Sequence, residues 1–444
     1  MPVPHRPRRP LPAALTALFS LLLLGACYGP EHPNSIFTRF TDWNRDVGFL
    51  FDLLLWFGMI VFVFVEVLLI VTIWKYRRRP GQGLPEQVHG NTKLEIIWTI
   101  IPTLVLVFIA VPTVKTIFRT QAKAKPDALQ VEVIGRQWWW EFRYPQYTTT
   151  GANGKVDTLV TANELYMPIG RTVNFSLRTA DVLHSFWIST LAGKRDLISN
   201  HTNYLWFTPD SVSENAFNGT CNEYCGASHA NMKFRAYTVS AENFESWAQN
   251  QLLPSVGAAA VAQPGAPTGA PPAGAGAAPV APPLNQASVL PTAPAADQAV
   301  APATFVTFPA EQLGPHNIPR TPIPAAVKLQ PGVVGDASRG AQAFAMGTGA
   351  CIGCHTVRGV PTAMGRIGPD LTHVGGRHTI AAGLFPNDTA HLGAWIKNAR
   401  AMKPGVLMPA LAKGQFDPVT KATLQAGLTD QQAADIAAYL LTLK

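Results

Sequence analysis

The 444-residue chain is long enough for several domains, and 47% of its residues are hydrophobic. Its formal net charge is +8 at pH 7, but the basic residues form no stripe of the kind that recognises nucleic acid, so no nucleic-acid partner is predicted. The chain has five cysteines. Four of them belong to two close pairs described below, which leaves Cys27 without a partner for a structural disulfide.

Residues 1–26 have the pattern of a secretory signal peptide. Basic residues precede an apolar run from Leu11 to Leu24, and two small residues then lead to Cys27. The segment Leu24-Gly-Ala-Cys27 resembles a bacterial lipoprotein signal, so we predict that Cys27 becomes a lipidated N-terminus. The alternatives are ordinary cleavage and retention of the segment as a third membrane span.

Two apolar stretches, roughly residues 48–74 and 94–118, are each long enough to cross a bilayer, which takes about 20 residues in a helix. The basic segment 75–79 lies between them and places this connection in the cytoplasm by the positive-inside rule. We therefore predict that residues 27–120 form an N-terminal segment and a two-helix transmembrane hairpin, with the rest of the chain on the outer face.

Residues 121–252 have the pattern of a small all-β domain. Three short runs of alternating polarity read as strands, namely Val131–Ile134, Thr172–Leu177 and Phe234–Val239. They predict a Greek-key barrel or sandwich.

Soft metal ligands gather within this domain in Cys221-Asn-Glu-Tyr-Cys225-Gly-Ala-Ser-His229-Ala-Asn-Met232. Thiolate and thioether donors favour copper over magnesium, calcium or manganese, and methionine is not a usual ligand of structural zinc. An upstream histidine, His184, would complete a set of two cysteines, two histidines and one methionine. A zinc site or a disulfide is the alternative, although neither needs Met232.

This pattern resembles the copper A site of cytochrome c oxidase subunit II. In that family the two cysteines bridge two copper ions, the histidines and the methionine are terminal ligands, and one backbone carbonyl also binds. The resemblance implies a cupredoxin-like fold and the following ligands: His184, Cys221, Glu223 through its carbonyl, Cys225, His229 and Met232.

Residues 253–330 are rich in Ala, Pro and Gly and carry very little charge. Such a composition buries too little apolar surface to fold and predicts a flexible linker. A linker of this kind would hold the next domain at high effective concentration, and we expect that domain to dock and undock.

Cys351-Ile-Gly-Cys354-His355 is the C-x-x-C-H motif that attaches a c-type haem through two thioethers and supplies an axial histidine. The opposite ligand in high-potential cytochromes c is usually methionine. We predict Met408 for this position, with Met402 as the alternative.

The same motif also occurs in redox dithiols, but Gly368-Pro369-Asp-Leu371 resembles the cytochrome c segment that supports the proximal histidine. The chain then closes on a helix with a capping-box pattern at Thr429 and Gln432. Residues 331–444 are therefore predicted to be an all-α cytochrome c domain.

The multidomain chain resembles subunit II of caa3-type haem-copper oxidases, which carry a fused cytochrome c domain. The resemblance implies an electron-input subunit that passes electrons from its haem c to copper A and on to subunit I, which reduces dioxygen and translocates protons. The implied partners are subunits I and III and an external donor such as a cytochrome c or a cytochrome bc complex. The implied location is the bacterial inner membrane, with both terminal domains on the periplasmic face.

The resemblance gives roles to further residues. Trp138 matches the residue at which electrons enter, and Glu95 matches a carboxylate at the mouth of a proton pathway. The side chain of Glu223 would reach a magnesium ion at the boundary with subunit I, which Lys194 and Asp196 also face. The alternatives are core packing for Trp138, an interfacial carboxylate that ends a helix for Glu95, and solvated loop charges for the others.

Other functions are compatible with parts of the pattern. The same module could serve a nitric oxide reductase with a copper A site, and the copper motif alone could belong to a membrane-tethered copper-handling protein, which has no need of a haem domain. A quinol oxidase subunit is disfavoured because such subunits lack the copper ligands.

Overall fold

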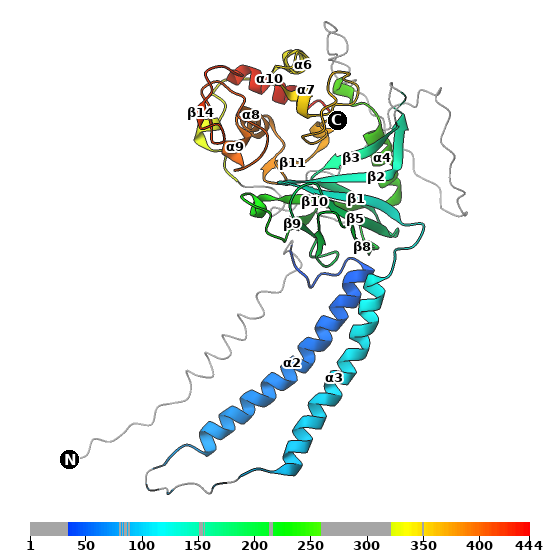
Figure 1. Ribbon diagram of the computed structural model, residues 1–444, viewed down its shortest axis with the longest axis vertical. Helices are drawn as coiled ribbons and strands as arrows, with labels where there is room; N and C mark the ends of the chain where they lie inside the picture. Colours follow the sequence, from blue (N-terminus) through cyan, green and yellow to red (C-terminus); the bar gives the residue numbers. More distant parts are fainter. Residues whose placement is uncertain are drawn as a thin grey trace, which may run out of the picture. The chain divides into compact units, whose positions relative to one another are not determined.

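The computed structural model describes residues 34–258 and 321–444, apart from 80, 82, 84–86, 88, 151–153, 155, 213–215 and 349. The predicted signal segment, Cys27 and residues 259–320 of the predicted linker lie outside the described residues. The chain divides into two compact units. The first contains the helices α2 (Asp42–Lys75) and most of α3 (Thr92–Gln121), and the second contains the strands β1 to β14 and the helices that follow α3 (Figure 1).

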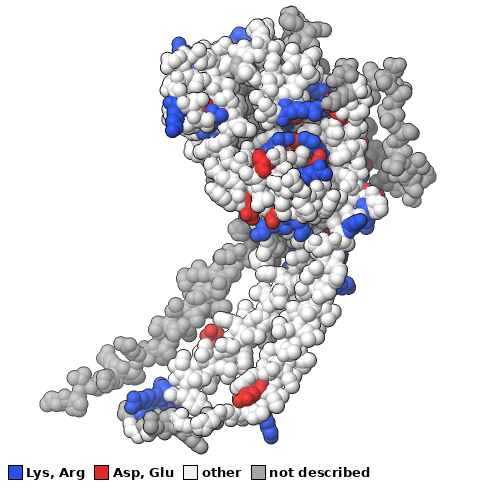
Figure 2. All heavy atoms as spheres, in the orientation of Figure 1, with Lys and Arg blue, Asp and Glu red and all other residues white. Residues whose placement is uncertain are grey.

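Helices α2 and α3 form the hairpin of the first unit. The N-terminus of α2 is capped by Thr41, whose hydroxyl accepts a hydrogen bond from the backbone N–H of Asn44. Both helices are long and apolar enough to cross a membrane, and none of their most apolar windows is buried. Their surface is almost free of charged side chains along its middle part (Figure 2). Each helix extends beyond the span predicted from the sequence at both ends.

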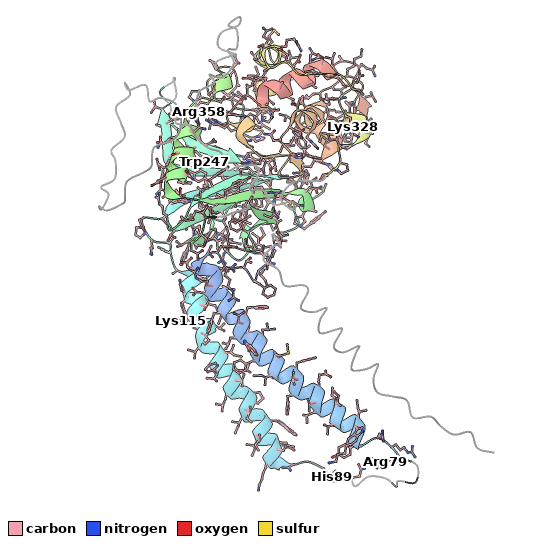
Figure 3. The ribbon with its side chains drawn as sticks, turned by 180° about the vertical axis from the view of Figure 1, so that it is seen from behind. Arg79, His89, Lys115, Trp247, Lys328 and Arg358 are labelled. Carbon is pink, nitrogen blue, oxygen red and sulfur yellow. The ribbon has the colours of Figure 1, made fainter. Side chains whose placement is uncertain are left out.

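Basic side chains gather at the connection between these helices (Figure 2). Arg79 and His89 lie in this connection, whereas Lys115 lies near the other end of α3 (Figure 3). The hairpin therefore has the charge distribution expected of a membrane anchor with a basic turn.

Two five-stranded sheets and helix α4 (Ala241–Leu252) make up the β-domain. The strand orders are β3-β2-β1-β5-β8 and β4-β10-β9-β6-β7. Strand β1 runs parallel to β5 and β4 runs parallel to β10, while the remaining pairs are antiparallel. The bounds are β1 (Leu129–Arg136), β2 (Trp139–Thr150), β3 (Val156–Ala162), β4 (Glu164–Pro168), β5 (Val173–Thr179), β6 (His184–Trp187), β7 (Arg195–Leu197), β8 (Asn203–Phe207), β9 (Phe217–Cys221) and β10 (Lys233–Val239).

Aromatic side chains fill the core of the β-domain. Phe186 on β6 stacks on Phe234 on β10 with ring centroids 5.0 Å apart, and Trp140 on β2 packs edge-on against Phe234 at 5.5 Å. The contact between Trp140 and Phe234 joins the two sheets, and the contact between Phe186 and Phe234 links two strands of one sheet. The loops at the ends of these strands are thus carried by a rigid support.

The C-terminal domain, residues 321–444, is mainly helical. The predicted capping box is confirmed, because Thr429 and Gln432 exchange the expected hydrogen bonds at the start of the last helix. Two short strand pairs, which the sequence did not suggest, accompany the helices. The bounds are α6 (Ala337–Ala345), α7 (Cys351–Cys354), β11 (Thr379–Ile380), β12 (Phe385–Pro386), α8 (Thr389–Lys397), α9 (Ala399–Met402), β13 (Phe416–Asp417), β14 (Ala422–Thr423) and α10 (Asp430–Leu440).

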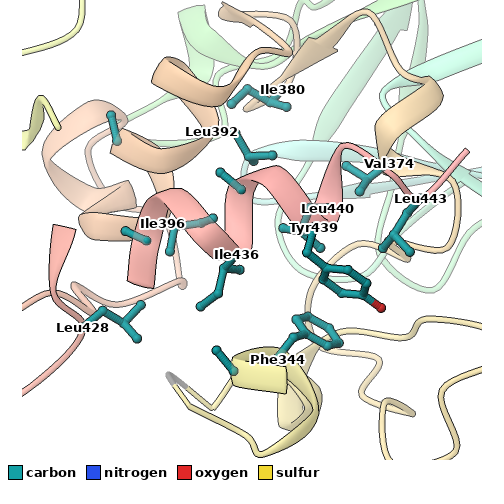
Figure 4. Close-up of a cluster of buried hydrophobic side chains, with 14 of the residues drawn as sticks. Phe344, Val374, Ile380, Leu392, Ile396, Leu428, Ile436, Tyr439, Leu440 and Leu443 are labelled. Carbon is teal, nitrogen blue, oxygen red and sulfur yellow. The ribbon is translucent and has the colours of Figure 1, made fainter. Parts of the chain in front are cut away.

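The core of this domain forms around α10, whose Ile436 and Tyr439 face Phe344 of α6 and neighbouring apolar side chains (Figure 4). Ala258 and Val327 are also buried in this cluster. These two residues lie on either side of the undescribed segment 259–320.

Candidate metal centres

The predicted copper ligands lie at the ends of three neighbouring strands. His184 is the first residue of β6, and Cys221 is the last residue of β9. These strands pair with Phe186 opposite Cys221, and the backbone N–H of Cys221 donates to the carbonyl of Met232 at 3.0 Å, just before β10 begins. Cys225 lies in the loop after β9. The sheet register therefore brings residues almost forty positions apart to one edge.

The donor atoms contact one another in a closed group. The sulfur of Cys221 lies 3.8 Å from the sulfur of Cys225, 3.8 Å from Nδ1 of His184 and 3.3 Å from the carbonyl oxygen of Glu223. The sulfur of Cys225 lies 3.6 Å from Nδ1 of His229 and 3.9 Å from the sulfur of Met232. Both cysteines are free thiols, so the alternative of a disulfide is wrong for this structure.

The two thiols affect each other's protonation. Contact with Cys225 lowers the pKa of the Cys221 thiol to about 3, whereas contact with Cys221 raises the pKa of the Cys225 thiol. Two adjacent thiolates repel each other, so both ionise only when a positive charge lies beside them. Copper ions would supply that charge, and the thioether of Met232 favours copper over zinc.

Two neighbours hold the donor group in place. Asp181 accepts a hydrogen bond of 2.8 Å from Nε2 of His184, which leaves Nδ1 of that ring turned toward Cys221. Trp138 donates from its indole Nε1 to the carbonyl of Cys225 at 2.9 Å. Trp138 was predicted from its sequence motif, whereas Asp181 was not, although its position three residues before His184 was a signal for it.

The C-x-x-C-H motif forms the short helix α7 and the residue after it. Nδ1 of His355 donates to the carbonyl of Pro369 at 2.8 Å, so its Nε2 remains available as an iron ligand. Burial lowers the pKa of His355, which keeps the ring neutral as metal binding requires. Cys351 and Cys354 are free thiols, as thioether attachment demands. These residues fit a covalently attached haem c.

The methionines near this motif differ in their surroundings. Met402 is buried within the hydrophobic cluster of the C-terminal domain, and Met364 is 67% exposed. Met408 is half-buried in the loop that follows α9. This loop position supports Met408 as the second axial ligand, which stays a prediction.

An ion pair that the sequence did not reveal organises the loop carrying Met408. Arg400 donates to both carboxylate oxygens of Asp417, at 2.6 and 2.8 Å, and also to the carbonyls of Val406 and Leu407. Burial opposes ionisation of Asp417, but Arg400 and neighbouring backbone N–H groups outweigh it and lower the pKa of Asp417 to about 2. The charged carboxylate therefore stabilises the loop.

Replacing Asp417 with asparagine is expected to destabilise the C-terminal domain by about 2 kcal/mol near pH 7, because it weakens a buried charge-assisted bond. The depressed pKa of Asp417 means that its stabilisation is fully present above the ordinary value of 3.8 and is lost as the pH falls toward 2. Chemical denaturation from pH 7 to pH 2 should show the gap between the two proteins closing over this interval. A constant gap would contradict the assignment.

The remaining predicted residues lie apart from these two clusters. Glu95 is in the first turn of α3 and is exposed. Lys194 lies over the ring of Trp187, with its ammonium 5.5 Å from the ring centroid, and Asp196 is on β7. The side chain of Glu223 is exposed although its carbonyl faces Cys221.

Comparison with known proteins covers all three parts of the chain. Family models match residues 41–116 as "Cytochrome C oxidase subunit II, transmembrane domain", residues 129–239 as its "periplasmic domain" and residues 337–444 as "Cytochrome c". A probable cytochrome c oxidase subunit 2 from Rickettsia bellii is 32% identical over 207 residues, which are 44% of this chain and 76% of the relative. The chain belongs to the cytochrome c oxidase subunit II family.

A second relative matches the full domain order of this subunit II chain. Cytochrome c oxidase subunit 2 of Alkalihalophilus pseudofirmus is 29% identical over 401 residues, which are 88% of this chain and 89% of the relative. Among solved structures, the periplasmic domain of subunit II of cytochrome oxidase (CoxB) of Bradyrhizobium japonicum is 26% identical. The match covers 29% of this chain and 96% of the solved chain, and its TM-score is 0.25.

Family membership confirms the predicted fold class, which combines a two-helix hairpin, a cupredoxin-like β-domain and a C-terminal cytochrome c domain. As a subunit II, the chain is a component of a haem-copper oxidase and a partner of subunit I, and its hairpin anchors it in a membrane. The alternative of a nitric oxide reductase subunit receives no support from these relatives.

Proposed function

We propose that this chain is the electron-input subunit of its oxidase. The C-terminal domain accepts electrons from an external donor, and the β-domain delivers them to subunit I, where dioxygen is reduced and protons are translocated. The observation that carries this proposal is the closed group of two thiol sulfurs, two imidazole nitrogens, one thioether sulfur and one carbonyl oxygen, linked by contacts of 3.3 to 3.9 Å.

Each group of donor atoms identifies the residues that would hold one cofactor. When bound, two copper ions and one haem c supply one-electron redox chemistry. The copper ligands are His184, Cys221, Glu223 through its carbonyl, Cys225, His229 and Met232, and the haem residues are Cys351, Cys354, His355 and Met408.

The surrounding residues orient these ligands. Asp181 keeps the proton of His184 on Nε2 and so presents Nδ1 to the cysteines. The carbonyl of Pro369 keeps the proton of His355 on Nδ1 and so leaves Nε2 of that ring for the haem iron. Trp138 is bonded to the ligand loop through Cys225, which supports its role as the residue at which electrons enter the β-domain.

Further roles concern the partner subunits and the membrane. Glu95 would lie at the mouth of a proton pathway into subunit I, and the exposed side chain of Glu223 would bind a magnesium ion at the boundary that Lys194 and Asp196 also face. Subunit III and a cytochrome c or cytochrome bc complex complete the set of proposed partners.

We place the hairpin in a bacterial inner membrane with its basic connection in the cytoplasm, which puts the β-domain and the C-terminal domain on the periplasmic side. Removal of residues 1–26 and lipidation of Cys27 would add a second anchor on that side. The proposed divisions of the mature chain are 27–120, 121–252, 253–330 and 331–444.

Optical and electron paramagnetic resonance spectra of the purified membrane complex test this function. We expect a mixed-valence two-copper signal in the oxidised protein and the spectrum of a low-spin c-type haem, with both responding to reduction. Copper chelation after reduction should remove the first signal and leave the second. A c-type haem without any two-copper signal would reduce the chain to a membrane-bound cytochrome and overturn the proposal.

A further inference from the structure

Three consecutive residues of the C-terminal domain contact Trp138 and the copper-ligand loop. Nζ of Lys403 donates to the carbonyl of Trp138 at 2.5 Å. The hydroxyl of Ser228 donates to the carbonyl of Pro404 at 2.6 Å. At Gly405 the approach is so close that a Cβ atom would lie 2.5 Å from Cη2 of the Trp138 ring, so only glycine fits there.

Lys403 is buried in this contact, with 2% of its surface exposed. Its second acceptor is the carbonyl of Ala381, at 3.2 Å, in its own domain. Burying an amine that lacks hydrogen-bond partners is costly. The buried amine of Lys403 therefore depends on the β-domain for one of its two acceptors. A bond of this kind contributes register and orientation more than affinity, because desolvation offsets most of the attraction.

A second patch joins the two domains on strands β4 and β10. The backbone N–H of His378 donates to Oε1 of Glu164 at 2.7 Å, and Nδ1 of His378 lies 3.0 Å from the hydroxyl of Tyr237. Arg235 donates to the carbonyl of Gly383 at 3.3 Å. Glu164 and Arg235 are both buried in this patch.

A third patch lies at the end of helix α4. Nη1 of Arg358 donates to the carbonyl of Gln251 at 2.7 Å, and Nε2 of His373 donates to the carbonyl of Leu253 at 3.0 Å. The three patches use different parts of the β-domain, namely the ligand loop, the β4 and β10 strands and α4. Three separate points of contact prevent the C-terminal domain from rotating as a rigid body against the β-domain.

We propose that Lys403 and Gly405 form a docking latch on Trp138, which holds the chain's own cytochrome c domain over the copper-ligand loop and closes this surface to any second cytochrome. The latch rests on the proposed function, since it names the partner that delivers electrons at this surface. It replaces the expected docking and undocking with a fixed arrangement. Lys403 is a positioning residue in this scheme, because it acts through the backbone of Trp138.

The first test measures access to the Lys403 amine in the full-length chain within the purified complex. An acetylating reagent should modify Lys403 about tenfold more slowly than Lys413, an exposed lysine of the same domain, as read by mass spectrometry of the peptides. Equal rates of modification would overturn the latch. This readout does not depend on turnover.

The second test follows electron transfer from the reduced haem to the oxidised copper centre after a laser flash, in the whole complex. For the native protein we expect a rate that does not change with solvent viscosity. Lys403→Met keeps the length of the side chain but loses the donor, and should slow the transfer by about tenfold and make it depend on viscosity. Lys413→Met is the matched control and should behave as the native protein.

The possible results separate the latch from the proposed function. Absence of any transfer between haem and copper in the native protein would contradict the function itself. Transfer that is viscosity-dependent in the native protein, or unchanged in Lys403→Met, would overturn the latch alone. If Lys403→Met loses either cofactor spectrum, the labelling rates and the viscosity dependence of the native protein decide the question.

Discussion

Replacing Cys221 with serine is expected to abolish the two-copper signal and to lower oxidase turnover by about a hundredfold or more, because this sulfur contacts three other donors at once. Serine has nearly the same size, so the change removes a ligand and leaves the packing of β9 intact. Electron paramagnetic resonance of the purified complex measures the copper signal, and oxygen uptake measures turnover. The haem c spectrum should be unchanged.

Thr220→Ser, at the preceding residue of the same strand, is the control for Cys221→Ser. The serine hydroxyl retains the acceptor that Thr220 offers to the side-chain amide of Asn222 at 2.8 Å. This variant should retain both the copper signal and the turnover. A two-copper signal of native shape in Cys221→Ser would show that the metal lies elsewhere.

Replacing Gly368 with alanine is expected to displace the proximal histidine and to destroy the low-spin haem spectrum. A Cβ atom at this position would lie 2.4 Å from Cε1 and 2.7 Å from Nδ1 of His355, well inside van der Waals contact. The ring must move, and its bond to the carbonyl of Pro369 would break. Optical spectra should show a haem that is still covalently attached but no longer low-spin, while the copper signal stays native.

Gly353→Ala adds the same methyl group within the C-x-x-C-H motif, where no atom lies within 4 Å of the added Cβ. It should keep the low-spin spectrum. Equal effects of the two substitutions would mean that general instability of the motif, and not displacement of His355, is responsible.

The chemistry of the two centres was predictable because it resides in short motifs. Cys221, Cys225, His229 and Met232 lie within one turn and loop, and the C-x-x-C-H residues are contiguous. His184 was harder to place, since only the register of β6 against β9 brings it to the cysteines. The resemblance to a known family supplied that link where residue patterns could not.

The residues that the sequence could not reveal act across long separations. Lys403 contacts Trp138 over 265 positions, and Arg400 contacts Asp417 over 17 positions in an irregular loop. Neither pair has a periodicity or spacing that local pattern analysis detects, because their meeting depends on how whole domains and loops pack. The two short strand pairs of the C-terminal domain were missed for a related reason, since two-residue strands carry no alternation.

The burial of Ala258 and Val327 in one hydrophobic cluster changes the meaning of the long Ala/Pro/Gly-rich segment. Ala258, which precedes the undescribed residues, is already buried in the C-terminal domain, as is Val327 after them. The chain therefore reaches that domain six residues after α4 ends at Leu252. The short piece of chain after α4, and not the long segment that follows it, determines the reach of the cytochrome.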